Sequence, residues 1–285
     1  MVVLFCEQRM NERTFSDSEI AQFKRLIWDF YAHHKRDFPW RETAEPYHIF
    51  ISEVMLQQTQ APRVIEKYKE FIQELPNFNS LASAPFDKVL RLWQGLGYNR
   101  RAKYLQEAAK KVVQEFEGTL PQDPKILATF PGIGAATSAS ICAFAFNEPV
   151  VFIETNIRRV YIHHFFNDAE LVSDKDILPF VKRALDAENP REWYWALMDY
   201  GTHLAKTMPN PNRRSKHYTK QTKFAGSNRQ LRGAILKTLL NNGSLARSEL
   251  LHLLPFDSKK SEDAIEQMIG EGFLKADYKN ISLVA

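Results

Sequence analysis

The chain has very few cysteines and no long apolar run. With only Cys6 and Cys142 among 285 residues, it can form neither a disulfide framework nor a four-thiolate metal site. Its apolar runs are far too short to span a bilayer. Its first residues, MVVLFCEQRM, lack the basic segment and the cleavage site of a signal peptide. We therefore expect a protein of a reducing cytoplasm with no membrane partner.

What is present fits a globular protein with a helical first domain. Hydrophobic residues make up 44% of the chain and charged residues 25%. Most of residues 17–205 consists of amphipathic segments separated by proline and glycine, and no segment shows sustained two-residue alternation. This pattern predicts an all-α domain over residues 1–205.

Positive charge is concentrated in one stretch after that domain. The whole chain has a net charge of +4, whereas residues 206–232 contain eight Lys and Arg and no Asp or Glu. Its prolines and low apolar content indicate an exposed linker over residues 206–229. The linker is either simply solvated or contacts DNA phosphates, for which we name Arg213, Arg214 and Lys216 as candidates.

The remaining residues, 230–285, have the pattern of a small α+β domain. Helical segments over 231–240, 244–254 and 257–270 precede two short strands around a turn at 277–280. This order predicts a winged helix-turn-helix, which either contacts DNA or only packs against its neighbours. Acidic residues on the third helix argue against reading of the major groove.

Glu53 lies in an apolar helical segment that ends abruptly in amides, ISEVMLQQTQ at residues 51–60. Burial among these apolar neighbours would raise the pKa of its carboxyl toward the range that a general acid needs near neutral pH. The alternative is a solvated carboxylate on the polar face of an amphipathic helix. The segment alone does not decide between the two.

Two further patterns place polar groups at helix starts. Gly132 and Gly134 lie between two helical segments, where both would permit positive φ and close backbone approach. The amides that follow form an anion site suited to a DNA phosphate, unless the turn is only a compact connection. Glu154 follows an apolar run and precedes Thr155 and Asn156, which predicts an anion stabilised at a helix N-terminus or a plain helix cap.

Several motifs together resemble the MutY-type adenine DNA glycosylases of the helix-hairpin-helix, endonuclease III-like superfamily. The resemblance extends over about residues 20–205. It implies a two-lobed helix-hairpin-helix glycosylase fold, all-α, that acts as a monomer on double-stranded DNA carrying a mispaired or damaged base. The motifs are FPWR at 38–41, PY at 46–47, SEVMLQQTQ at 52–60, GLGY at 95–98, FPGIG at 130–134 and ETNIRRV at 154–160.

The resemblance also implies residue roles, consistent with the two carboxyl groups in different environments that N-glycosidic bond cleavage requires. Glu53 would protonate the leaving base, and Glu154 with Asn156 would stabilise the sugar cation. Gln57, Gln58 and Tyr98 would enter the base stack. Further DNA contacts are expected from Thr59, Gly132 and Gly134, and a base pocket is expected from Trp40, Arg41, Leu56, Ala136 and Trp195.

The chain departs from the family pattern at several positions. Glu154 stands where the family has an Asp, and Trp195 stands where it has a Glu or Gln. Ala136 replaces the Schiff-base Lys of bifunctional relatives, which predicts hydrolysis by water. Residues 202–229 hold no cysteine, so we expect no iron–sulfur cluster, no metal and no other cofactor.

The C-terminal residues also depart, because they are too short for the family's Nudix-like domain. The leading hypothesis is excision of adenine opposite 8-oxoguanine or guanine by a bacterial-type, nucleoid-associated enzyme. The alternatives are a glycosylase of the same fold for another modified or deaminated base and a non-catalytic DNA-damage-binding protein.

Overall fold

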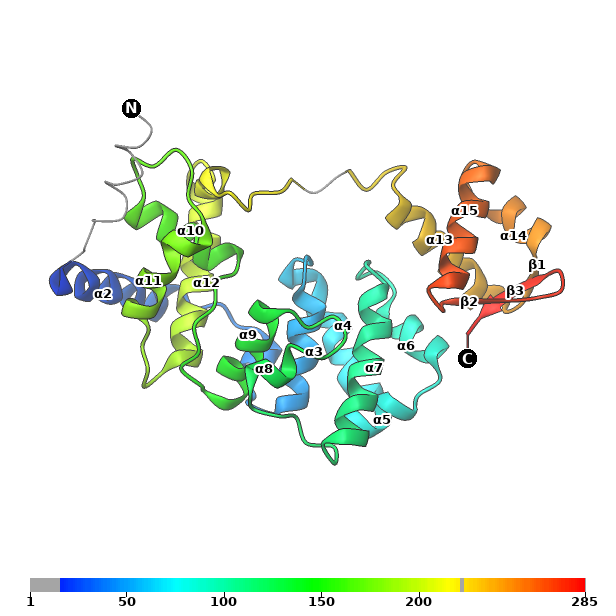
Figure 1. Ribbon diagram of the computed structural model, residues 1–285, viewed down its shortest axis with the longest axis horizontal. Helices are drawn as coiled ribbons and strands as arrows, with labels where there is room; N and C mark the ends of the chain where they lie inside the picture. Colours follow the sequence, from blue (N-terminus) through cyan, green and yellow to red (C-terminus); the bar gives the residue numbers. More distant parts are fainter. Residues whose placement is uncertain (1–15, 221–222, 285) are drawn as a thin grey trace. The chain divides into compact units, whose positions relative to one another are not determined.

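The structure, a computed structural model, describes residues 16–220 and 223–284 and is mostly helical (Figure 1). The chain divides into two compact units: unit 1 runs to Asp37 and continues over Cys142–Tyr218, and unit 2 comprises Phe38–Ile141 and the chain from Thr219. The helical prediction is confirmed, whereas the predicted domain boundaries at residues 205 and 229 stay predictions. Cys6 and the segment assessed as a signal peptide lie outside the described residues.

Unit 1 is built around helix α2 (Asp17–His34). Ser16 and Glu19 form a capping box at its start, with Glu19 N donating to Ser16 Oγ at 3.2 Å. The ring of Phe23 lies 5.3 Å from that of Tyr161 and 6.1 Å from that of Trp193, so the core lies where α2 meets α10 and α12. The other elements of unit 1 are the end of α9 (Ala135–Phe146), α10 (Thr155–Phe165), α11 (Asp174–Ala184), α12 (Pro190–Thr207) and the 3-10 helix η2 (Pro211–Arg214).

Unit 2 contains a helical bundle and the C-terminal module. Among the described residues of the chain, no helix is both long and apolar enough to cross a membrane. Phe71 and Trp93 are buried in the bundle, with ring centres 6.3 Å apart. The bundle consists of η1 (Pro39–Arg41), α3 (Pro46–Leu56), α4 (Ala61–Glu74), α5 (Phe78–Ser83), α6 (Phe86–Trp93), α7 (Arg100–Glu115), α8 (Pro124–Leu127) and the start of α9.

The C-terminal module has the predicted three helices and strand hairpin. The sheet is antiparallel in the order β1-β3-β2, and the prediction missed strand β1. Strand β1 is only two residues long, which is too short to show an alternation of apolar and polar residues. Its Leu245 pairs with Ile281 of β3. Because these residues belong to the strand, the second helix begins at Arg247 and not at Ser244. The elements are α13 (Asn228–Asn242), β1 (Leu245–Ala246), α14 (Arg247–Leu253), α15 (Ser258–Gly270), β2 (Leu274–Asp277) and β3 (Asn280–Leu283).

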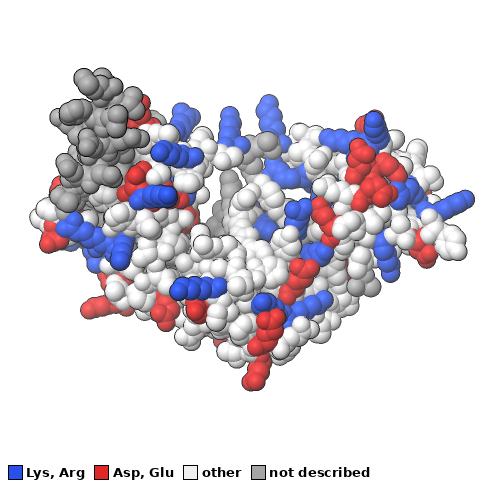
Figure 2. Space-filling model, in the orientation of Figure 1, with Lys and Arg blue, Asp and Glu red and all other residues white. Residues whose placement is uncertain are grey.

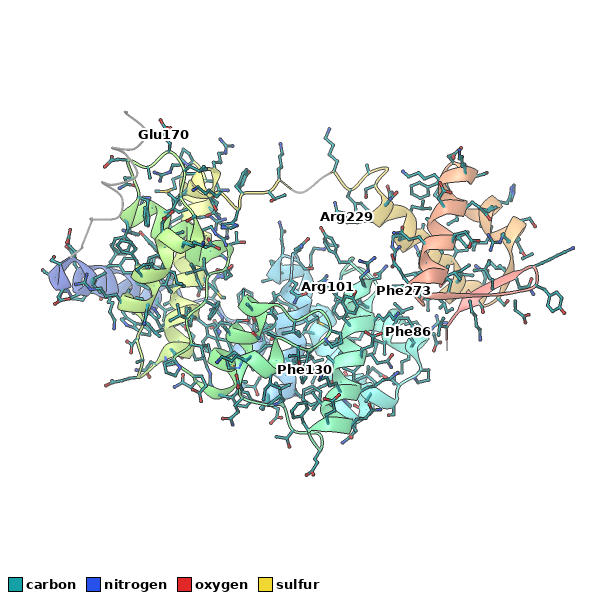
Figure 3. The ribbon with its side chains drawn as sticks, in the orientation of Figure 1. Phe86, Arg101, Phe130, Glu170, Arg229 and Phe273 are labelled. Carbon is teal, nitrogen blue, oxygen red and sulfur yellow. The ribbon has the colours of Figure 1, made fainter. Side chains whose placement is uncertain are left out.

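The module packs against α6 and α7 within unit 2. Phe273 and Phe86 lie beside each other with ring centres 5.9 Å apart (Figure 3). Arg91 of α6 donates to the carbonyl oxygen of Leu240 at the end of α13, at 2.6 Å. An apolar contact and a partly buried hydrogen bond thus fix the module to the bundle.

Candidate active site

Glu53 lies in the last turn of α3. Ile51, Val54 and Met55 are buried, whereas Glu53 is half-buried, which lies between the two alternatives of a buried acid and a solvated carboxylate. The buried Ile49 and Phe50 lie one turn before Glu53 on the same face of α3, so burial of this face decreases toward the end of the helix. The carboxyl group nevertheless meets a buried partner: Glu53 Oε2 lies 2.5 Å from Ser140 Oγ on α9.

The Ser140 hydroxyl has two oxygen neighbours and one hydrogen. Its Oγ lies 3.0 Å from the carbonyl oxygen of Thr137 as well as 2.5 Å from Glu53. The Ser140 hydroxyl donates to Glu53 Oε2, with Thr137 O as its alternative acceptor. This bond fixes one oxygen of the carboxyl group and leaves Oε1 as the oxygen that can carry a proton. Sequence reasoning missed Ser140 because 87 residues separate it from Glu53 and no motif marks it.

Arg101, a second residue that the sequence did not reveal, holds the end of α3 in place. Its buried guanidinium donates to the carbonyl oxygens of Val54 and Met55 at 2.8 Å each, and to Thr59 Oγ1 at 2.9 Å. It also donates to the carbonyl oxygen of Gly97 at 3.1 Å. Burial lowers the pKa of Arg101 to about 10, so it remains charged at neutral pH. One side chain therefore joins the turn that follows Glu53 to the turn that carries Tyr98.

The two turns joined by Arg101 carry the predicted wedge residues. Gln58 has a φ of 54° and Tyr98 a φ of 49°, which is uncommon for residues other than glycine and is enriched at functional sites. The side chain of Gln57, the third predicted wedge residue, is held by a hydrogen bond within the protein, because its Nε2 donates to the carbonyl oxygen of Gly132 at 3.1 Å. Thr59 is also occupied within the protein, as the acceptor for Arg101.

The glycine hairpin precedes α9. Gly132 has a φ of +72°, and a Cβ there would lie 2.9 Å from the Tyr104 ring. The positive φ and the close approach predicted for this glycine are therefore both confirmed. Gly134 differs: its φ lies outside the left-handed region and nothing approaches its Cβ position within 4 Å. The predicted positive φ at Gly134 is therefore wrong, whereas a close approach of DNA to this glycine stays a prediction. A role of the hairpin in phosphate binding stays a prediction.

Glu154 is the N-cap of α10, as the sequence predicted. Its Oε1 accepts from the backbone amides of Asn156 and Ile157 at 2.7 and 2.8 Å, and its Oε2 accepts from Asn156 Nδ2 at 3.3 Å. Desolvation raises the pKa of this carboxyl above its usual value, outweighing the amide bonds and the nearby Arg159, which lower it. The helix start therefore stabilises the anion as predicted, but burial of the carboxyl group outweighs this contribution.

Hydrogen bonds from Arg159 hold the side chain of Asn156 in place. Arg159 Nη1 donates to Asn156 Oδ1 at 2.6 Å and to the carbonyl oxygen of Gly201 at 2.8 Å. Its Nε donates to Asn210 Oδ1 at 3.2 Å. A Cβ at Gly201 would lie 2.5 Å from the backbone oxygen of Asn156, so α12 passes directly against the start of α10. The first part of the basic linker thus helps to hold Glu154 and Asn156.

The three cations predicted to bind phosphate differ in their surroundings. Arg214 is partly buried, and its Nη1 donates to the carbonyl oxygens of Phe166 and Asn167 at 2.5 and 2.6 Å, just beyond the end of α10. Arg213 and Lys216 are exposed. Lys and Arg side chains project outward from the linker in the space-filling view (Figure 2). Arg214 is therefore bound within unit 1, whereas Arg213 and Lys216 are exposed, and their contact with DNA stays a prediction.

The residues predicted to form a base pocket are distributed over both units. In unit 2, Trp40 is buried and stacks on Phe38 at 4.9 Å. In unit 1, Trp195 is buried and stacks on Phe144 at 5.8 Å. Their role at the base stays a prediction. In unit 2, Arg41 lies over the Phe38 ring, Leu56 ends α3 half-buried, and Ala136 is exposed in the first turn of α9.

Comparison with known proteins first defines the class. Residues 51–178 match the family described as HhH-GPD superfamily base excision DNA repair protein. A thermostable thymine-DNA glycosylase has a similar structure, with a TM-score of 0.61 and 24% identity over 70% of this chain and 93% of that chain. A non-covalent endonuclease III–DNA complex gives a TM-score of 0.59 at 16% identity, over 69% of this chain and 91% of that chain. These likenesses show the fold.

Sequence relatives then define the family. The adenine DNA glycosylase of Mycolicibacterium smegmatis is 30% identical over 90% of this chain and 93% of its own length. That of Mycobacterium tuberculosis is 31% identical over 90% of both chains. That of Buchnera aphidicola is 34% identical over 67% of this chain, which spans only 55% of it. The chain belongs to the adenine DNA glycosylase family.

Proposed function

We propose that the protein is a monofunctional DNA glycosylase that hydrolyses the N-glycosidic bond of adenine mispaired with 8-oxoguanine or guanine. The observation that carries the proposal is the Glu53–Ser140 pair at the end of α3, in a chain of this family. The partner is double-stranded DNA with a mispaired or damaged base. We further propose that the protein acts as a monomer in the cytoplasm and uses no cofactor.

Glu53 is the acid in this reaction. A flipped purine becomes a better leaving group when a carboxyl group protonates one of its ring nitrogens. The Ser140 hydroxyl donates to Glu53 Oε2 and holds the carboxyl group in one orientation, so that Oε1 can carry the proton to the base. Ala136 supplies no amine for a Schiff base, so water completes the reaction and the strand stays intact until the abasic site is cleaved chemically.

Glu154 is the anion that stabilises the positive charge developing on the sugar. It serves this role only when ionised, and burial raises the pKa of its carboxyl. A carboxyl with a raised pKa gains its proton at a higher pH than usual as the solution becomes acidic. Excision should therefore fall on the acidic side sooner than for an ordinary carboxylate. Asn156 holds this carboxyl and is itself held by Arg159.

Labelled duplexes test the proposal. Adenine opposite 8-oxoguanine, adenine opposite guanine, hypoxanthine and uracil are each incubated with the protein, and abasic sites are then cleaved with alkali. Breaks only in the adenine duplexes support the proposal, and breaks without alkali contradict the monofunctional mechanism. Glu53→Gln should abolish breaks but not DNA binding, whereas Glu66→Gln, an exposed control on α4, should change neither.

A second candidate is a glycosylase of the same fold for another base. The longer side chain of Glu154 favours it, because the family has an Asp at this position. Breaks in the hypoxanthine or uracil duplexes but not in the adenine duplexes would select this candidate.

A further inference from the structure

Gln57 joins the end of α3 to the glycine hairpin and to α9, within unit 2. Its Nε2 lies 3.1 Å from the carbonyl oxygen of Gly132 and 3.2 Å from Thr137 Oγ1, so the two hydrogens of one amide group serve two acceptors. Gln57 is half-buried, whereas the neighbouring Gln58 is exposed and has a positive φ. The two adjacent glutamines therefore differ, because the side chain of Gln57 is bound to two other segments of unit 2.

A second hydrogen bond joins α3 and α9 about one turn away. Glu53 lies four residues before Gln57, the C-cap of α3, and Ser140 lies three residues after Thr137 on α9. Residues at these spacings share one face of a helix. The Ser140 hydroxyl donates to Glu53 Oε2 at 2.5 Å, and Gln57 Nε2 donates to Thr137 Oγ1 (Figure 1). Two successive hydrogen bonds thus hold the last turn of α3 in register with α9, where a single bond would let it pivot.

The helix α7 holds the hairpin and the end of α3 from another direction. The ring of Tyr104 lies so close to Gly132 that a Cβ on this glycine would be 2.9 Å from it. Arg101, three residues earlier on α7, donates to two carbonyl oxygens in the last turn of α3. The hairpin and the end of α3 therefore both contact one face of α7, and Gln57 joins them directly to each other.

We propose that Gln57 is a positioning residue that couples the glycine hairpin to Glu53, and that it does not enter the base stack. The inference rests on the proposed function and on the predicted contact of the hairpin with a DNA phosphate. A phosphate held at the start of α9 would lie at a fixed distance from the acid, because hydrogen bonds at Thr137 and Ser140 join α9 to the end of α3. Such positioning accelerates the chemical step and leaves DNA affinity nearly unchanged.

Single-turnover excision and base flipping separate positioning from insertion. Gln57→Met keeps the length of the side chain and removes the amide group. It should lower the excision rate roughly ten- to hundredfold, as expected for the loss of two hydrogen bonds. DNA affinity and the fluorescence increase of a 2-aminopurine placed beside the flipped adenine should stay within about twofold, because flipping does not need this amide.

Substitutions at Thr137 test the other end of the hydrogen bond. Thr137→Val removes the hydroxyl and keeps the shape of the side chain, so it should slow excision roughly fivefold. Thr137→Ser keeps the hydroxyl and should restore the rate. Gln57→Met combined with Ser140→Ala should slow excision by less than the product of the two single effects, because both hydrogen bonds act on one carboxyl group. Effects that multiply in full would show that Gln57 acts independently of Glu53 and would contradict the coupling.

Gln73→Met is the matched control, because it removes an exposed amide from α4 and should change neither excision nor flipping. Loss of the 2-aminopurine signal in Gln57→Met, with excision falling in proportion, would show that Gln57 enters the stack and would overturn the inference. An unchanged excision rate in Gln57→Met would overturn it as well.

Backbone hydrogen exchange over residues 132–137 does not depend on catalysis. It should increase in Gln57→Met without DNA and stay unchanged in Gln73→Met, because only the first variant releases the hairpin from α3. Unchanged exchange in Gln57→Met would contradict the inference. If this exchange increases while the wild-type protein excises no adenine from any duplex, the proposed function fails, whereas the coupling between the hairpin and α3 stands.

Discussion

At the scale of single residues, the hydrogen bond from Ser140 orients the carboxyl group of Glu53. Ser140→Ala should lower the single-turnover excision rate about ten- to hundredfold, as expected for the loss of a hydrogen bond to an acidic group, with DNA affinity unchanged. Ser138→Ala is the matched control, because Ser138 is buried on the same helix but donates to the Ala135 carbonyl oxygen at 3.0 Å. Equal losses in the two variants would show that Ser140 acts only through the stability of α9.

His164 makes the stability of unit 1 sensitive to acid. It packs against Phe23 and lies 3.1 Å from the Tyr200 hydroxyl, and burial, followed by the neighbouring His163, lowers its pKa from 6.5 to about 4. A histidine with a lowered folded-state pKa binds its proton more readily when unfolded. Stability is therefore complete above about pH 6.5 and is lost as the pH falls toward 4.

His164→Phe keeps an aromatic ring and cannot titrate, so its stability should depend less on pH. Between pH 7 and pH 5 the wild-type protein should lose about 2 kcal/mol more than the variant. Urea unfolding of both proteins at the two pH values, followed by tryptophan fluorescence, measures this difference. Parallel losses in the two proteins would rule out His164 as the source of the acid sensitivity.

At the scale of elements, the first part of the basic linker contains one arginine that stabilises unit 1, Arg214, and two exposed cations, Arg213 and Lys216. Replacement of Arg213 and Lys216 by Gln should weaken DNA binding equally for all sequences. It should also reduce the slope of log K against log salt by about 2. Arg214→Gln should instead destabilise unit 1, because the carbonyl oxygens of Phe166 and Asn167 lose their donor. Salt titrations of DNA binding and thermal unfolding separate the two effects, and an identical salt slope in all the proteins would contradict this division of tasks.

Elements with strong local signals were predictable, and contacts between elements were not. Glu154 could be placed at the start of α10 because an apolar run followed by Thr155 and Asn156 is a local pattern. The direction of its pKa shift depends on burial by distant segments, which the local pattern does not reveal. Arg101 gave no signal, because an arginine in an amphipathic helix looks the same whether it is solvated or clamps the carbonyl oxygens of Val54 and Met55.

At the scale of the whole molecule, Glu271 connects the C-terminal module to the bundle of unit 2. It follows α15 and accepts from Arg100 of α7 and Arg232 of α13, and its carbonyl oxygen accepts from Lys103 Nζ. Burial alone would raise the pKa of this carboxyl, but the hydrogen bonds from the two arginines outweigh it and lower the pKa. Glu271 therefore stays ionised well into the acidic range, and its contribution to docking is lost only as the pH falls through its lowered pKa.

Glu271→Gln should loosen the module at neutral pH, because a neutral amide replaces the charge that holds both arginines. Backbone hydrogen exchange should increase in α13 and in the first turn of α7. Glu262→Gln is the matched control, since Glu262 pairs with Arg247 inside the module and should change exchange only in α14 and α15. Unchanged exchange in α13 and α7 of the Glu271→Gln protein would mean that the Phe86–Phe273 contact and the Arg91–Leu240 hydrogen bond hold the module without it.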